Sequence, residues 1–182
     1  MNWLPPTLET PRLILRAMTM ADVEAVFTAC SNPRMTEHTL FETHLNRETS
    51  TAFVRDYVLR NYEDGIPDCF AIALKGEPAK LLGCAGGRWT ESRCNRCVEF
   101  GYWIAEPFWN QGYATEAVKM LVPYLFETLK PERVQAHVMA PNRASARVLE
   151  KAGLDYEGTL RKAVFRRGVY WDIKMYSKVM VL

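Results

Sequence analysis

VEFGYWIAEPFWNQGYATEA, residues 98–117, is the stretch of sequence that decides the fold. Its first half alternates as a strand does, and the remainder predicts a loop and then a helix that begins at Gly112. The first N–H groups of a helix have no intrahelical partner and the helix dipole favours negative charge, so such a start can bind phosphate. The small residues Gly112 and Ala114 would let a diphosphate approach the main chain. By itself the motif is weak, because a glycine turn before a helix is also a common plain connection.

The flanking sequence predicts a mixed α/β fold. A second unit of strand, loop and helix follows, and Gly153 is a natural left-handed cap for its helix at 143–152. Apolar periodicity predicts further helices at 19–30, 48–62 and 113–128, the last with a kink or an early end at Pro123. Strand patterns occur at 12–16, 69–74, 80–84, 97–104, 133–139, 156–165 and 169–179. We therefore expect a mostly antiparallel sheet of about seven strands, flanked by about four helices.

Composition indicates one folded domain over residues 1–182. The chain is 48% apolar and 24% charged, which is typical of globular proteins. A formal net charge of +2 provides no general field for nucleic acid, and no run of apolar residues is long enough to span a membrane. The sequence also begins without an export signal. We expect a cytoplasmic protein, monomeric or homodimeric, that binds neither nucleic acid nor membranes.

The cysteines predict neither a disulfide framework nor a metal site. Five cysteines are an odd number, which favours reduced thiols in a chain without an export signal. Cys94 and Cys97 form a single CxxC motif, and two ligands do not make a tetrahedral zinc site. We interpret these two thiols as incidental and expect no metal.

The chain resembles the GNAT (general N-acetyltransferase) superfamily, and within it the RimJ/RimL-like branch, whose members acetylate protein N-termini. The likeness spans nearly the whole sequence and is strongest after Val98. It rests on TPRLILR at 10–16, VEFGYWI at 98–104, GYATEA at 112–117, PNRASARVLEKAGL at 141–154, and EGTLRKAV and GVYWDIKMYS near the end. The resemblance implies an acetyl-CoA-dependent N-acetyltransferase that moves the acetyl group directly to a primary amine.

The resemblance also implies how acetyl-CoA is held. In the superfamily the fourth strand splays from the fifth, and pantetheine lies in the gap. Gly101 suits a bulge or a close backbone approach, which would free N–H groups for pantetheine and the thioester oxygen. The diphosphate motif corresponds to residues 109–114, where Trp109 replaces the usual Arg or Gln and Asn110 a common Gly. The implied cofactor contacts are Tyr102, Trp103, Ile104, Trp109, Asn110, Gln111, Gly112, Tyr113, Ala114, Thr115, Asn142, Ser145 and Arg147.

Glu99 is the candidate general base. It lies on the strand face that also carries Gly101 and Trp103. In the resembled branch a glutamate at this position faces the acceptor and takes its proton directly or through water. The alternative is a cross-strand ion pair between Glu99 and an arginine.

Two residues compete as the acid that protonates the departing thiolate. The resemblance places Ser145 near the sulfur and Asn142 on pantetheine, although both residues also fit simple capping of the short helix. Tyr156 is the rival acid, because GNAT enzymes often use a tyrosine in this role.

Basic residues recur on the short helix at Arg143, Arg147 and Lys151, spaced four apart on one face. They form either a solvated face or an edge that meets the 3′-phosphate of CoA.

The amine acceptor is the least determined part of the prediction. From the resemblance we expect a protein N-terminal α-amine, such as that of a ribosomal protein. A polyamine, an amino acid or an aminoglycoside remains an alternative, as does a regulatory module that binds acyl-CoA without turnover. The acceptor site is expected in the first two helices and their loops, about 28–64, where the sequence singles out no residue.

Overall fold

The computed structural model describes residues 3–90 and 96–180. Its eight strands form one sheet in the order β1-β2-β3-β4-β5-β6-β8-β7. Every neighbouring pair is antiparallel except β5 and β6, which run parallel. The strands are β1 (Leu8–Glu9), β2 (Leu13–Arg16), β3 (Phe70–Leu74), β4 (Glu77–Trp89), β5 (Cys97–Ile104), β6 (Arg133–Met139), β7 (Asp155–Arg166) and β8 (Val169–Val179). The mostly antiparallel sheet is confirmed, with the short β1 added to the expected seven strands.

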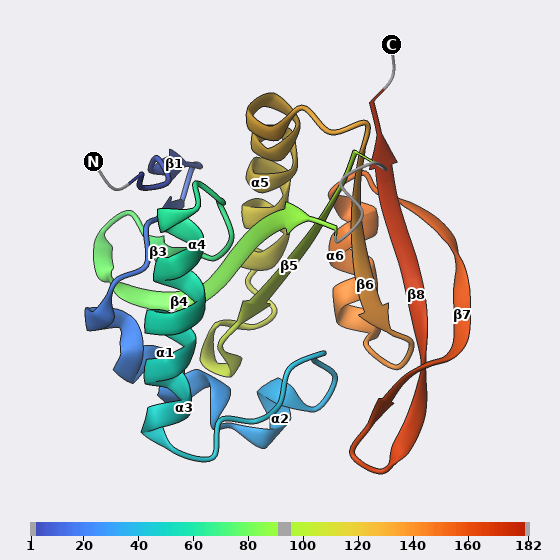
Figure 1. Ribbon diagram of the computed structural model, residues 1–182, viewed down its shortest axis with the longest axis horizontal. Coiled ribbons are helices and arrows are strands. Elements are labelled where there is room, and N and C mark those ends of the chain that lie inside the picture. Colours follow the sequence, from blue (N-terminus) through green and yellow to red (C-terminus); the bar gives the residue numbers. More distant parts are fainter. Residues whose placement is uncertain (1–2, 91–95, 181–182) are drawn as a thin grey trace.

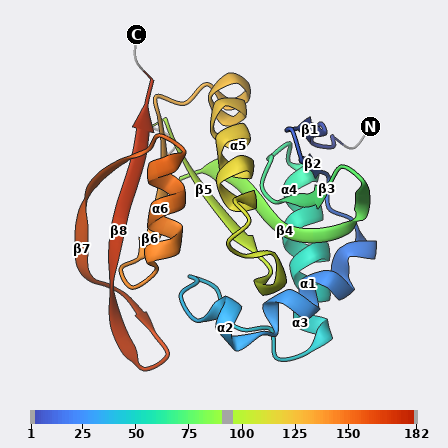
Figure 2. The same ribbon diagram turned by 180° about the vertical axis from the view of Figure 1, so that it is seen from behind.

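Helices cover both faces of the sheet. Figure 1 shows α1 (Val23–Cys30), α3 (Arg47–Ala52) and α4 (Leu59–Glu63) on one face, with α2 (Pro33–Thr36) at its lower edge. Figure 2 shows α5 (Tyr113–Leu129) and α6 (Arg143–Lys151) on the opposite face. Within the described residues, no helix is long and apolar enough to cross a membrane.

The predicted helix at 48–62 is present as one continuous helical run, but its middle part is not α-helical. Between α3 and α4 the residues Phe53–Val58 form a π-helical segment, labelled η2. A π-bulge inserts an extra residue into a helical turn and is often found at functional sites. Here it carries Phe53 and Tyr57, whose stacked rings lie 5.7 Å apart.

Pro123 does not end α5 early. The helix continues from Tyr113 to Leu129, so this part of the expectation is wrong. A proline removes the hydrogen bond to the carbonyl four residues earlier, which belongs to Lys119. Both Pro123 and Lys119 are exposed, so water can satisfy that carbonyl. Gly153 has the left-handed conformation expected after α6, with φ of +83°.

Alternation along β5 separates two hydrophobic cores. Val98, Phe100 and Ile104 belong to the core beneath α5 and α6. Trp103 belongs to the other core, which packs against α1 and the η2 segment. The face that carries Trp103 also carries Glu99 and Gly101, as the sequence predicted.

β5 and β6 separate soon after they meet. Their register comprises three residue pairs, of which Glu99↔Gln135 is the last along both strands. Figure 1 shows the two strands diverging as a V from this point. The splay expected between the fourth and fifth predicted strands is therefore present.

The bulge expected at Gly101 is absent from the β4–β5 ladder. Gly101 pairs with Gly86 in a register that runs unbroken from Gly83↔Ile104 to Trp89↔Val98. Because β6 diverges from β5 after Glu99, the edge of β5 that faces β6 is left unpaired there, and no bulge is needed to expose it. A Cβ added to Gly101 would meet nothing within 4 Å, so this residue leaves open space above the sheet.

Candidate active site

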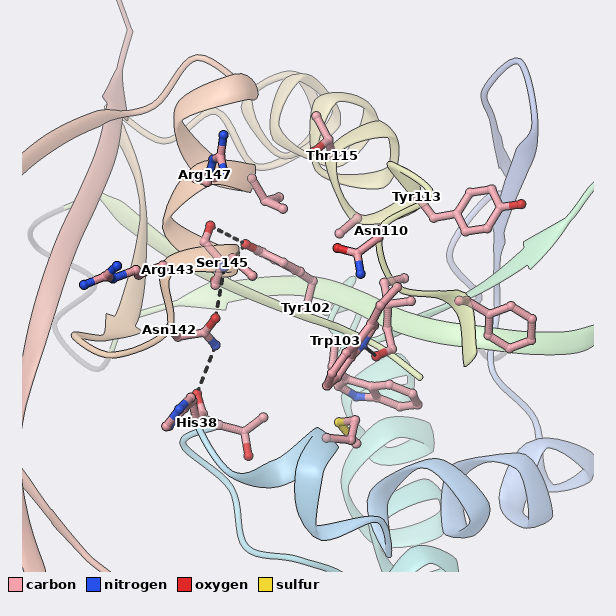
Figure 3. Close-up of a pocket in the computed structure, with 18 of the residues that line it drawn as sticks. His38, Tyr102, Trp103, Asn110, Tyr113, Thr115, Asn142, Arg143, Ser145 and Arg147 are labelled. Atoms are coloured by element: carbon pink, nitrogen blue, oxygen red, sulfur yellow. Dashed lines mark hydrogen bonds between the residues drawn. The ribbon is translucent and has the colours of Figure 1, made fainter. Parts of the chain in front are cut away.

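A cavity of about 710 Å³ lies between the end of β5, the start of α5 and the N-terminal half of α6. We call it the donor cavity. Its volume is typical of cofactor sites. It brings together every predicted cofactor residue except Gln111, namely Tyr102, Trp103, Ile104, Trp109, Asn110, Gly112, Tyr113, Ala114, Thr115, Asn142, Ser145 and Arg147. Figure 3 labels several of them, and these come from β5, from the loop before α5, from the start of α5, and from α6 with its cap, namely Tyr102, Trp103, Asn110, Tyr113, Thr115, Asn142, Ser145 and Arg147.

The loop before α5 presents backbone to the donor cavity. Asn110 and Gly112 both have positive φ, at +59° and +81°. Such turns direct successive N–H groups into a concave anion site, and α5 begins directly afterwards. The Trp109 indole donates a 2.6 Å hydrogen bond to the Ile104 carbonyl, which fixes the loop to β5. The loop therefore keeps the backbone conformation of an anion-binding turn despite the side-chain departures at positions 109 and 110.

Arg12 and Glu116 hold the same loop from behind, a contact that sequence reasoning missed. The Arg12 guanidinium pairs with the Glu116 carboxylate at 2.7 Å and donates to the Gln111 carbonyl at 3.0 Å. It also lies 4.7 Å from the ring centre of Tyr113, whose ring points away from Tyr102 and Ser145 in Figure 3. Gln111 is thus outside the cavity lining, and its carbonyl is used to brace the loop.

Asn142 caps α6, whereas the Ser145 hydroxyl pairs with the hydroxyl of Tyr102. The Asn142 Oδ1 accepts from the Ser145 backbone N–H at 3.0 Å, and its Nδ2 donates to the His38 carbonyl. The Ser145 Oγ lies 2.8 Å from the Tyr102 hydroxyl (Figure 3). Burial raises the pKa of Tyr102, so this phenol stays protonated. The capping interpretation holds for Asn142, and Ser145 instead forms a hydroxyl pair at the cavity.

The basic stripe of α6 borders the donor cavity. Arg143, Arg147 and Lys151 all line it, as the second interpretation of the stripe requires. Tyr156 lines neither this cavity nor the one described next. It is half exposed on β7, and its hydroxyl lies 2.7 Å from that of Thr159. The structure therefore brings Ser145, and not Tyr156, into the site.

A second cavity of about 470 Å³ adjoins the first, and we call it the acceptor cavity. The two share His38, Thr39, Tyr102, Trp103, Asn142 and Ser145. Aromatic side chains from the first third of the chain line much of it, among them Phe41, Phe53 and Tyr57. The sequence placed the acceptor site in this region without naming residues, because no local motif marks them.

A buried carboxylate lies in the wall of the acceptor cavity. The Tyr57 hydroxyl donates to Asp68 and accepts a 2.7 Å hydrogen bond from Arg88. Burial raises the pKa of Asp68, against the opposing effects of Tyr57 and Arg88. A desolvated carboxylate of this kind gains stability when a positively charged group binds beside it.

Glu99 contacts a histidine and not the arginine that its alternative interpretation required. His137 Nδ1 on β6 lies 3.1 Å from Glu99 Oε2. Hydrogen bonding to His137 lowers the pKa of Glu99 and outweighs the effect of burial. Arg88, opposite Glu99 in the β4–β5 register, lowers it further by its charge alone. His137 lines the acceptor cavity, whereas Glu99 lines neither cavity.

The described cysteines are free thiols. Cys30, Cys69, Cys84 and Cys97 are all buried, while Cys94 lies outside the described residues. Burial raises the pKa of Cys97, so this thiol is poorly suited to metal or redox chemistry. Within residues 3–90 and 96–180, no cluster of three or more metal-ligating side chains is present.

Comparisons of the sequence and the fold with known proteins give a consistent set of relatives. A family model described as an acetyltransferase (GNAT) domain matches residues 12–155. The uncharacterized N-acetyltransferase YoaA of Bacillus subtilis is 32% identical over 174 residues, covering 96% of this chain and 97% of that protein. The crystal structure of a GNAT family acetyltransferase from Bacillus anthracis aligns with a TM-score of 0.84 at 25% identity, covering 96% and 98% of the two chains. The ribosomal-protein-serine acetyltransferase of Escherichia coli is 27% identical over 86 residues, 47% of this chain and 48% of that protein.

Proposed function

The chain belongs to the GNAT acetyltransferase family, and from this premise we propose that it moves the acetyl group of acetyl-CoA to the α-amine of a peptide or protein. The main support for the proposal is the contact between the two cavities. The donor and acceptor cavities share a boundary that includes Tyr102, Trp103 and Ser145, so a thioester and an amine can meet there. Direct transfer then needs no covalent enzyme intermediate.

The donor cavity offers a separate group to each part of acetyl-CoA. Backbone N–H groups at the start of α5 suit the diphosphate. The edge of β5 beyond Glu99 has no partner in its register with β6, so it can pair with pantetheine and offer N–H groups to the thioester oxygen. Arg147, with its neighbours on α6, suits the 3′-phosphate.

The acceptor side suits an amine that arrives charged and must lose a proton. Asp68 in the cavity wall and Glu99 behind His137 supply negative charge. An α-amine, with a pKa of about 8, is partly neutral at neutral pH, whereas a lysine at about 10.4 is almost wholly charged. The α-amine is therefore the easier nucleophile for a site of this kind.

Ser145 is the acid that we propose for the departing thiolate. Its hydroxyl lines both cavities and pairs with the Tyr102 hydroxyl, which can replace a proton that Ser145 donates. Tyr156, with its hydroxyl directed to Thr159, offers no such path.

The choice of a peptide acceptor is supported by the relatives. The Escherichia coli protein that resembles nearly half of this chain is named for acetylating a serine of a ribosomal protein. The match is partial, so the acceptor has to be tested directly.

Mass spectrometry of acetyl transfer tests the proposal. Acetyl-CoA is supplied with peptides that begin with Ala, Ser or Met, each in a free and an N-terminally blocked form, alongside polyamines, amino acids and aminoglycosides. Acetylation of the free peptides alone supports the α-amine acceptor. Turnover confined to a small amine would replace it with that class. Binding of acetyl-CoA without any transfer would instead indicate a regulatory module.

A further inference from the structure

His137 lies where β5 and β6 part. The last residue pair of the two strands is Glu99↔Gln135, and His137 follows two residues later on β6. In the proposed function, donor and acceptor meet beyond this pair, where the two strands have separated. A side chain at this position on β6 therefore lies at the edge of that opening.

The His137 side chain is on the acceptor side of the sheet. Val134, Ala136 and Val138 on the same strand belong to the core beneath α5 and α6. Because side chains alternate along a strand, His137 faces the other way, and it lines the acceptor cavity. Its exposed fraction is 25%, so a ligand in the cavity can reach it.

Glu99 is better suited to hold His137 than to take a proton itself. Its Oε2 is 3.1 Å from His137 Nδ1, which leaves the second ring nitrogen, Nε2, for another partner. Hydrogen bonding to His137 lowers the pKa of Glu99, which makes the carboxylate a weaker proton acceptor. A carboxylate in this arrangement fixes the tautomer of an imidazole and stabilises the imidazolium that forms.

We infer that His137 is the general base of the transfer and that Glu99 is its positioning residue. The inference rests on the proposed function and differs from the sequence-based prediction that Glu99 takes the proton directly or through water. Imidazole is the side chain that most often acts as a general base.

The proton balance of the step is simple. The amine nitrogen bonds to the acetyl carbon, its proton moves to Nε2 of His137, and the carbon–sulfur bond breaks. The thiolate takes a proton from the hydroxyl pair of Ser145 and Tyr102. The imidazolium then releases its proton through water, which restores the hydroxyl pair, and the products are the amide and CoA with the enzyme unchanged.

Two variants separate the base from its positioning residue. His137→Gln should lower kcat about a hundredfold or more, and at least as far as Glu99→Gln, while the affinity for acetyl-CoA stays unchanged. Circular dichroism and acetyl-CoA binding check that both variants fold. A His137→Gln enzyme that keeps most of its kcat, while Glu99→Gln is severely impaired, would return the role of base to Glu99.

The dependence of kcat on pH distinguishes a base from a residue that only supports the structure. Loss of a purely structural contact at His137 would not change the shape of this profile. His137 pairs with Glu99 on β5, and its β8 partner Met175 is uncharged. The other charged and titratable side chains in the cavity that His137 lines are Arg88, Asp68, His38, His44, Tyr57, Tyr102, Cys30, Cys69 and Cys84. The acid limb of kcat should vanish in His137→Gln, which has lost the proposed base, and should survive in Glu99→Gln, where the imidazole remains.

Failure of the inference differs from failure of the proposed function. A wild-type enzyme that acetylates no amine on the panel refutes the proposed function, and the role of His137 falls with it. An active wild type whose acid limb survives in His137→Gln overturns the inference alone.

Discussion

The donor and acceptor cavities are assembled in different ways. Two short stretches, 102–115 and 141–151, supply most of the donor cavity, and its groups for phosphate are largely backbone. The acceptor cavity takes Phe41, Tyr57 and Asp68 from separate elements, with further side chains from β4 and β6. The donor cavity depends on local backbone shape, whereas the acceptor cavity depends on which distant side chains the fold brings together.

The largest effect is expected on the acceptor side, where the proposed chemistry depends on the pair of Glu99 and His137. Glu99→Gln should lower kcat about a hundredfold, because the amide cannot stabilise a protonated His137. The affinity for acetyl-CoA should not change, since Glu99 does not line the donor cavity. Steady-state kinetics and calorimetric binding of acetyl-CoA measure the two quantities. Loss of both together would mean that the two cavities are less independent than their linings suggest.

On the donor side, a change in backbone conformation should lower the affinity for acetyl-CoA more than it lowers kcat. Gly112 has φ of +81°, and an added Cβ would come within 3.4 Å of Arg12 Nη2. Gly112→Val forces a branched side chain into a conformation that costs about 1–3 kcal/mol. If the loop relaxes to relieve that strain, the affinity for acetyl-CoA falls by roughly fivefold to a hundredfold.

Gly65→Val is the matched control for this substitution. Gly65 has a similar φ of +70° with nothing within 4 Å of an added Cβ, and it lines neither cavity. It should lower the melting temperature to a comparable degree and leave acetyl-CoA binding intact. Equal loss of affinity in both variants would show that the Gly112 effect is general destabilisation and not a change in the loop before α5.

The contrast between the cavities also explains what the sequence could predict. The strands 97–104 and 133–139 were predicted with the bounds that the structure has, because alternation and flanking turns are local signals. The donor residues followed from the resemblance of two stretches, each continuous along the chain. Gln111 is the one predicted donor residue outside the cavity lining, and its carbonyl accepts a hydrogen bond from Arg12, nearly a hundred residues away.

The acceptor residues could not be predicted in the same way. His137 has no distinguishing neighbours in sequence, and its importance depends on the parallel register that sets it beside Glu99. Tyr57 reaches Asp68 from a π-helical segment, which apolar periodicity reads as ordinary helix. Register and π-bulges are outcomes of tertiary packing, so neither leaves a clear local pattern.

The smallest effect is expected at the charged edge of the donor cavity. Arg147→Glu should raise the KM for acetyl-CoA by roughly two- to tenfold, because an exposed charge on α6 contributes about 1 kcal/mol or less to phosphate binding. The penalty should shrink in high salt, which screens exposed charges. Arg161→Glu makes the same charge change on β7, outside both cavities, and should leave KM unaltered. If Arg147→Glu behaves like this control, the stripe of α6 is a solvated face, and the donor cavity binds acetyl-CoA almost entirely through its backbone.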